Sequence, residues 1–277
     1  MRYLIFPLLL LTHMHLHAQS PVVIQWTEDP TTGDVVYTAA CDLAGLFSIE
    51  LDVQVRNLVA DQPFPVRIVL WGPFEPTEIL RLNQKRQGQG YSSRFSYTIS
   101  QGDIWNVHPD ADQIYWLPVE PGRPVRINQG FKGATSHRND YAIDLDMPVG
   151  TPVTAARAGR VIDLKEDSDR HCNAPRCMKY GNFVLIQHED GTFGNYVHLQ
   201  QGGVDVEIGD LVEAGQRIGR SGNTGYTSGP HLHFDVSVPN GLNRRTIPFQ
   251  IMDASGKPVR PREGQVYTRT SHPGQID

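Results

Sequence analysis

The segment SGPHLHFDV constrains the fold of this chain more than any other, because it defines a strand and its two faces. Leu232, Phe234 and Val236 alternate with His231, His233 and Asp235. Side chains of a strand point to opposite faces with period two, so the pattern predicts a strand with one face in a core and both imidazoles on the other. Two histidines on one face suit a metal site or an acid–base pair, although two surface histidines on a half-exposed strand give the same pattern.

The rest of the chain carries similar β-type signals. Its 277 residues include 26 glycines and 20 prolines among short apolar runs, which favours strands and turns over long helices. Residues 19–116 contain alternating segments such as VVIQW and SIELDVQVRNL, and predict an N-terminal β-sandwich-like domain. A second β-rich domain is predicted over residues 117–253, and the polar residues 254–277 predict a loosely ordered C-terminal tail. The expected fold class is therefore mostly β.

Residues 1–18 have the pattern of a secretory signal peptide. Arg2 precedes an apolar stretch, Leu4 to Leu11, that is too short to span a bilayer, and Ala18 offers a small residue at a cleavage point. We therefore expect an exported protein, periplasmic or secreted, with no membrane span after signal cleavage. The formal net charge is −5 and no strong basic patch occurs in the sequence, which argues against a nucleic-acid partner. The oligomeric state is not defined by the sequence.

The three cysteines separate into a close pair and a single residue. Cys172 and Cys177 lie five residues apart in DRHCNAPRCMKY, and an exported chain can oxidise them, so we predict a disulfide that closes a small loop. The alternative is a Cys/His metal site that includes His171, which would need more ligands than this loop contains. Cys41 is expected to be a small buried hydrophobic residue.

The second β-rich region contains the polar residues on which chemistry could depend. TSHRNDYAIDLDMPVG supplies His137 and Asp144, and NYVHL supplies His198. Strand alternation would place Asp144 and Asp146 on one face, and would put Tyr196 on the same face as His198. The glycine-rich run GRSGNTGYTSGP is not a phosphate loop, because it lacks the Lys-Ser/Thr ending; its Asn223, Thr224 and Tyr226 are candidates for contacts with a peptide. His188 is expected to be structural.

Together, GTPVTAARAGRV, YVHL, GQRIGRSGNTG and SGPHLHF resemble the LytM/lysostaphin-type zinc metallopeptidases of the M23 group, over roughly residues 121–250. The resemblance implies a LytM-type antiparallel β-sheet metallopeptidase domain with a Zn²⁺ ion. It implies that His137, Asp144 and His233 hold the zinc and that His198 and His231 face the substrate. The family's first motif usually places four residues from His to Asp, whereas His137 and Asp144 are seven apart. Asp140 is therefore the competing ligand; we prefer Asp144, because DLDMPVGTPV continues directly into the family's next segment.

The implied reaction is amide hydrolysis in the peptide cross-links of peptidoglycan. Three N/O ligands leave a zinc position open for water, which is the catalytic arrangement, and no HExxH motif provides a glutamate base. A near-neutral histidine can move the protons, but the sequence does not say which of the two is the base. Asp146 and Asp235 could orient ligand imidazoles or could be solvated carboxylates. Two alternatives stay open: a non-catalytic cell-wall-binding or regulatory module of the same fold, and an exported peptidase acting on proteins or peptides.

Overall fold

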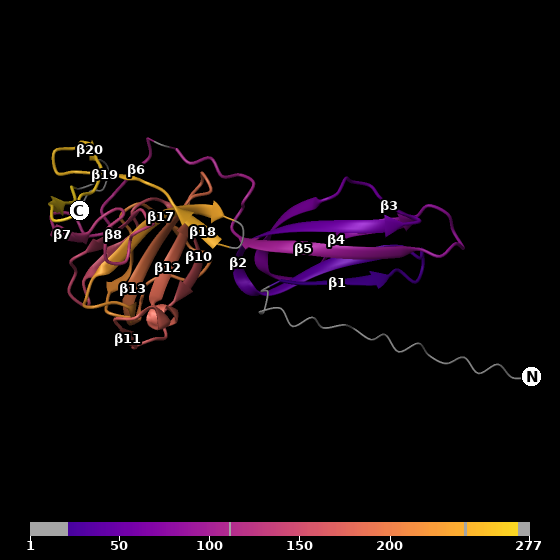
Figure 1. Ribbon diagram of the computed structural model, residues 1–277, viewed down its shortest axis with the longest axis horizontal. Helices are drawn as coiled ribbons and strands as arrows, with labels where there is room; N and C mark the ends of the chain where they lie inside the picture. Colours follow the sequence, from indigo (N-terminus) through magenta and orange to yellow (C-terminus); the bar gives the residue numbers. More distant parts are fainter. Residues whose placement is uncertain (1–21, 111, 241–242, 271–277) are drawn as a thin grey trace, which may run out of the picture.

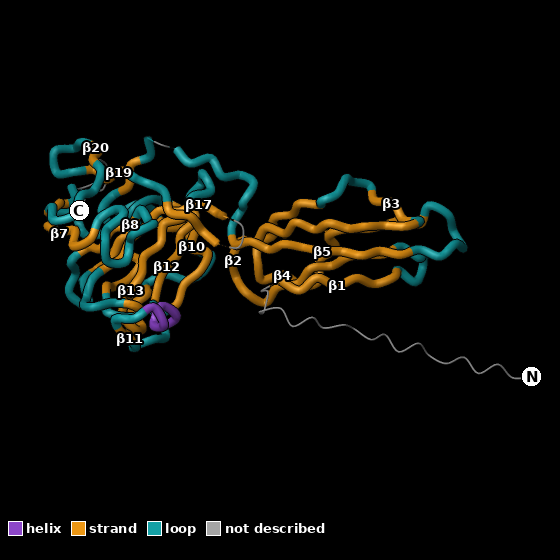
Figure 2. Tube along the Cα trace, viewed as in Figure 1, coloured by secondary structure: helices purple, strands orange, loops and turns teal. Residues whose placement is uncertain are grey.

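A computed structural model describes residues 22–110, 112–240 and 243–270. Two β-rich domains follow one another along the long axis of the molecule (Figures 1 and 2). Strands dominate both, and the helical element within the described ranges is a single short 3₁₀ turn, η1 (Pro175–Tyr180). The prediction of a mostly β protein is confirmed. The predicted signal peptide lies outside the described residues, and none of the helical structure that is described is long and apolar enough to cross a membrane.

The N-terminal domain is built on one long bent hairpin. Its strands are β1 (Val22–Glu28), β2 (Val35–Arg56), β3 (Leu58–Ala60), β4 (Val66–Gln84) and β5 (Ser92–Gln101). Strand β2 pairs with β4 along its length, with register shifts between Tyr37 and Gly45; β1 pairs with its first part and β5 with its second. Tyr37 packs edge-on against Phe95 of β5, with 5.3 Å between the ring centroids. The two halves of the sheet therefore face each other over one apolar core, which contains the buried Cys41 as predicted.

The second domain is organised by an antiparallel sheet. Its strand order is β14-β10-β12-β13-β17-β8-β7-β21, with β15, β9 and β18 attached at the sides. The bounds are β7 (Pro124–Gln129), β8 (Ala142–Leu145), β9 (Pro152–Thr154), β10 (Gly159–Lys165), β12 (Asn182–Gln187), β13 (Phe193–Val204), β14 (Leu211–Val212), β15 (Arg217–Ser221), β17 (Leu232–Asn240), β18 (Asn243–Thr246) and β21 (Val266–Thr268). The alternation read in HLHFDV is confirmed, because Leu232, Phe234 and Val236 lie in the core. The opposite face of β17 is thereby left for polar side chains.

The C-terminal segment is ordered as far as it is described, so the prediction of a loose tail over 254–277 is wrong for residues 254–270. Strand β20 (Pro258–Val259) pairs with β19 (Gln250–Met252), which also pairs with β6 (Ile114–Tyr115), and β21 pairs with β7. Arg269 is 1% exposed and donates from Nη1 to the carbonyl of Val119 and to Thr154 Oγ1, both at 2.9 Å. This segment is ordered despite its polar composition, because it pairs with strands that are distant in the sequence.

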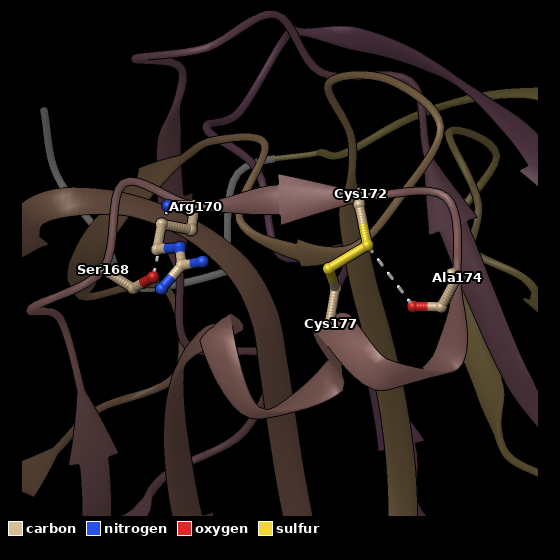
Figure 3. Close-up of a disulfide and its surroundings, with 5 residues drawn as sticks. All are labelled: Ser168, Arg170, Cys172, Ala174 and Cys177. Atoms are coloured by element: carbon tan, nitrogen blue, oxygen red, sulfur yellow. Dashed lines mark hydrogen bonds between the residues drawn. A yellow bond between two sulfur atoms is a disulfide. The ribbon is translucent and has the colours of Figure 1, made fainter.

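A disulfide joins Cys172 and Cys177, as predicted, and excludes these sulfurs as metal ligands. It links β11 (His171–Cys172) to η1 (Figure 3). Strand β11 pairs in parallel with β16 (Gly225–Tyr226), so the disulfide-closed loop is attached to the glycine-rich segment that precedes β17.

The N-terminal domain packs against the sheet of the second domain. Gly102 lies on the ring of Phe193, so closely that a Cβ at this glycine would be 2.4 Å from the ring. Phe193 forms a small buried apolar cluster with Ile162 and Leu185, separate from the main core. At the edge of the contact, the guanidinium of Arg160 lies 5.1 Å from the ring of Trp71.

Candidate active site

Strands β8 and β17 bring the predicted ligands together. His233 and Asp144 are directly paired in the register of these antiparallel strands, so their side chains project from the same face of the sheet. His137 reaches the same point from the loop between β7 and β8, and its side chain is 2% exposed. The loop therefore brings His137 beside Asp144, although the two residues are seven apart in the sequence.

Three potential metal-binding atoms converge here. His137 Nε2 lies 3.1 Å from His233 Nδ1 and 3.2 Å from Asp144 Oδ1, and His233 Nδ1 lies 3.1 Å from the same oxygen. Ligand atoms about 2.0–2.1 Å from a tetrahedral zinc are about 3.3 Å from one another. The three distances therefore fit three corners of a tetrahedral site, and these residues are the group able to hold a metal ion among the described residues.

The hydrogen bonds of the two ligand imidazoles also favour a cation between them. His137 Nδ1 lies 3.2 Å from the carbonyl of Gly130, and His233 Nε2 lies 3.3 Å from Asp235 Oδ2. Each of these nitrogens donates its proton outward in the tautomer that satisfies the acceptor, which leaves His137 Nε2 and His233 Nδ1 as lone pairs. Two lone pairs and a carboxylate oxygen about 3 Å apart repel one another unless a cation lies between them.

Asp144, and not Asp140, lies beside His137 and His233. Asp140 is exposed and accepts a hydrogen bond from Thr246 Oγ1 at 3.3 Å. Burial would raise the pKa of Asp144, but a proton or cation shared with the His137 and His233 rings outweighs burial and holds that pKa well below its usual range. The surroundings therefore favour the carboxylate form of Asp144.

Gln129 is a supporting residue that sequence reasoning missed. It is buried, and its Nε2 lies 3.3 Å from Asp144 Oδ2, the oxygen that is not aimed at the metal position. Its Oε1 accepts from the backbone amides of Thr135 and Ser136, at 3.1 and 3.2 Å, in the loop that carries His137. One side chain thus positions both ligands of the first motif. Nothing in the local pattern RINQG marks this glutamine, because its partners are distant in sequence or on an irregular loop.

Of the two carboxylates considered as orienting groups, only Asp235 contacts His233. Asp235 Oδ2 accepts from His233 and also from Asn195 Nδ2, at 2.9 Å, whereas Asp146 is exposed. Burial would lower the pKa of His233, but Asp144 and Asp235 together raise it to about 10. The surroundings therefore favour positive charge at this position.

His198 reaches the site through a β-bulge, which corrects one prediction. Asn182 pairs with Leu199 and Phe183 with Val197, so His198 is the extra residue on β13. Its φ of +69° is in the left-handed region, which is uncommon outside glycine. Tyr196 is buried in the core, whereas His198 lines the groove, so the two do not share a face as strict alternation predicted.

The two remaining histidines lie side by side with their Nδ1 atoms held by backbone. His198 Nδ1 donates to the carbonyl of Thr224 at 2.6 Å, and His231 Nδ1 donates to that of Gly229 at 2.8 Å. The ring centroids are 4.5 Å apart, and His231 Nε2 lies 3.6 Å from Asp144 Oδ1. Burial, together with His231 and His233, lowers the pKa of His198 to about 3. Both Nδ1–H groups are thus engaged, so each ring presents its Nε2 atom to the groove, and the lowered pKa makes His198 a weak base.

All five histidine and aspartate side chains line one groove of about 1130 Å³. Its lining also includes Asn173 and Pro175 of the disulfide-closed loop and Met178 and Lys179 of η1. Tyr226 lines the groove, but Thr224 is buried and its hydroxyl donates to the carbonyl of Leu199 at 2.8 Å. Thr224 therefore holds His198 rather than contacting a bound molecule. His188 is buried away from this groove, as expected for a structural residue.

Residues 138–247 match the sequence profile of Peptidase family M23. This chain contains an M23 peptidase domain. The matched range includes Asp144, His198, His231 and His233, and begins one residue after His137.

Curated relatives of the M23 domain agree with this assignment. Peptidoglycan DD-endopeptidase ShyA of Vibrio cholerae is 37% identical over 129 residues, which cover 46% of this chain and 26% of the relative. Glycyl-glycine endopeptidase ALE-1 of Staphylococcus capitis is 37% identical over 130 residues, which cover 46% of this chain and 31% of the relative. The matches thus span about a third or less of these relatives. The crystallised catalytic domain of lysostaphin from Staphylococcus simulans is 31% identical, with a TM-score of 0.33, over 43% of this chain and 81% of that domain.

Proposed function

We propose that this protein is an exported zinc endopeptidase that hydrolyses amide bonds in the peptide cross-links of peptidoglycan. The observation that carries the proposal is the convergence of His137 Nε2, Asp144 Oδ1 and His233 Nδ1 within 3.2 Å of one another, beside two further imidazoles. Two imidazole nitrogens and one carboxylate oxygen are a donor set that suits zinc and leaves a position open. The names of the relatives support the peptidoglycan substrate.

A bound zinc ion supplies Lewis acidity, which makes water more acidic and polarises a carbonyl oxygen. The roles of this chain's own residues are to hold that centre and to move protons. His198 and His231 have their Nδ1–H groups fixed by backbone carbonyls, so proton transfer occurs at Nε2. One of the two rings takes the proton of the attacking water, and the low pKa of His198 makes that ring a weak base. The protonated ring then donates to the developing oxyanion or to the leaving amine.

Export is supported by the disulfide as well as by the pattern of residues 1–18. Cys172 and Cys177 form a bond that persists in oxidising compartments and is rare in the cytosol. A periplasmic or secreted location also places the enzyme beside its proposed substrate.

The test uses the protein without its first 18 residues, incubated with purified sacculi, with defined cross-linked peptide dimers and with a panel of folded proteins. We expect cleavage of the dimers at one amide bond, loss of cleavage with a chelator and recovery with zinc. His233→Ala should abolish turnover, whereas His171→Ala, which removes an exposed histidine outside the groove, should not.

Two outcomes would favour the alternatives. A well-folded protein that contains no zinc would indicate a non-catalytic wall-binding module. Cleavage of the protein panel with intact sacculi would indicate a general peptidase.

A further inference from the structure

The face of the sheet that carries the metal ligands continues beyond them to the N-terminal domain. Along β17, His233, Asp235 and Ser237 all line the groove, and Ser237 is paired with Phe193 of β13. Directly paired residues of antiparallel strands share a face, so Phe193 continues the groove floor. Beyond this point the floor is apolar, in the cluster of Phe193, Ile162 and Leu185.

The N-terminal domain covers this end of the floor. Gly102 rests on the Phe193 ring, and its carbonyl accepts a hydrogen bond from the buried Ser48 Oγ at 2.7 Å. The preceding residue, Gln101, is the last residue of β5 and itself lines the groove. Strand β18 lies at this junction (Figure 1). The groove therefore has an end wall to which the N-terminal domain contributes.

Two polar contacts join this wall across the domain boundary. Gln101 Nε2 donates to Asp163 Oδ2 at 3.2 Å, and Gln101 Oε1 accepts from Arg244 Nη1 at 3.3 Å. Arg244 lies on β18, and its guanidinium is 5.9 Å from the centre of the Phe193 ring. The side chain that meets the groove here is thus an arginine positioned by both domains.

Most of the hydrogen-bonding capacity of Arg244 is free. Within residues 22–110, 112–240 and 243–270, Gln101 is its hydrogen-bond acceptor, and the carboxylates of Asp235 and Asp163 act on its charge without forming an ion pair with it. A guanidinium carries five N–H donors in a planar fork that matches a carboxylate. Closer to the metal ligands the groove contains Asp144 and Asp235, which would repel a carboxylate. Lys165 and Lys179 also line the groove, but Arg244 is the arginine among the described lining residues, and its planar fork matches a carboxylate.

We infer that the end wall formed by Gln101 and Arg244 binds a free carboxylate of the peptide substrate and so sets the register of the scissile bond against the metal centre. This inference rests on the proposed function and extends it, because it makes the N-terminal domain part of substrate recognition. Charge-assisted hydrogen bonds of this kind correspond to about a 10- to 100-fold effect on affinity.

The test compares otherwise identical cross-linked peptides in which each free carboxylate in turn is converted to the carboxamide. For the wild-type enzyme, one of these conversions should raise KM by about 10- to 100-fold with little change in kcat. Arg244→Gln should show that raised KM with the free acid and should no longer distinguish acid from amide. Arg244→Lys keeps the charge but not the planar guanidinium, so its KM for the free acid should lie between those of wild type and Arg244→Gln.

Arg245→Gln is the matched control. Arg245 is the neighbouring residue on β18, does not line the groove, and should behave as wild type. Equal melting temperature and zinc content in all variants would show that they are folded and loaded. If Arg244→Gln discriminated acid from amide as well as wild type does, or if no conversion affected the wild-type enzyme, the inference would be overturned while the proposed function stood. Failure of the wild-type enzyme to cleave any peptide would overturn both.

Discussion

Substituting Asp235 by asparagine removes a charge beside the metal centre while keeping its geometry. Asp235 Oδ2 accepts from both His233 Nε2, at 3.3 Å, and Asn195 Nδ2, at 2.9 Å. An amide oxygen at the same position can accept both bonds. Asp235→Asn therefore separates the effect of the carboxylate charge from the effect of holding the ring.

The size of the effect follows from the distance. Adding the imidazole ring and a zinc–nitrogen bond to the 3.3 Å contact places the Asp235 carboxylate about 7 Å from the metal position. Zinc with the Asp144 carboxylate has a net charge of about +1, and at an effective dielectric constant of about 20 the attraction is about 2 kcal/mol. That corresponds to about a 30-fold loss of zinc affinity, which lies within the 10- to 100-fold range typical of groups that orient metal ligands.

The assay is competition for zinc against a chromophoric chelator of known affinity at pH 7.5. Asp146→Asn is the control, because Asp146 is on the adjacent stretch of chain but exposed; it should change affinity less than twofold. Asp235→Ala, which also removes the hydrogen-bond acceptor of His233, should bind zinc more weakly than Asp235→Asn. An Asp235→Asn protein that binds zinc as tightly as the Asp146→Asn protein would refute the electrostatic reasoning.

Three further predictions concern stability. Burial lowers the pKa of His188 to about 4, so the unfolded chain binds a proton more readily than the folded chain, and the free energy of unfolding decreases as pH falls from about 6.5 towards 4. In urea unfolding, the decrease between pH 7.5 and pH 5 should be about 2 kcal/mol smaller for His188→Asn than for wild type. The double variant Cys172→Ser, Cys177→Ser should have a free energy of unfolding about 2 kcal/mol lower than wild type, a modest loss because the closed loop is short. Reductant should lower the melting temperature of wild type but leave that of the double variant unchanged. Tyr196→Phe should cost about 1–3 kcal/mol in thermal unfolding, because the Ala156 amide loses its acceptor at 2.7 Å, with kcat/KM unchanged.

Several features of the site could be predicted because they depend on local periodicity or on short motifs. Alternation in HLHFDV separates Leu232 and Phe234 from His231 and His233, and the structure keeps that separation. The close spacing of Cys172 and Cys177 made the disulfide predictable. The His137–Asp144 assignment depended on the continuation of the motif, and the structure brings these two residues, rather than Asp140, to His233.

Other features could not be read from the chain. The same alternation rule that was right for β17 was wrong for β13, because a bulge at His198 moves this side chain to the face opposite Tyr196. A bulge is decided by the register with the neighbouring strand, which local sequence does not specify. Composition likewise predicted a loose tail, whereas β21 completes the sheet beside β7.

The sequence by itself determined the candidate site residues, because each of them lies in a short motif whose pattern marks it. Only the tertiary structure decided what holds and bounds them. Gln129 supports Asp144 across the hairpin, Thr224 holds His198 across the sheet, and Gln101 brings the N-terminal domain to Arg244. These contacts join segments between 15 and 143 residues apart, and such pairings follow from how strands and domains pack, not from any local period.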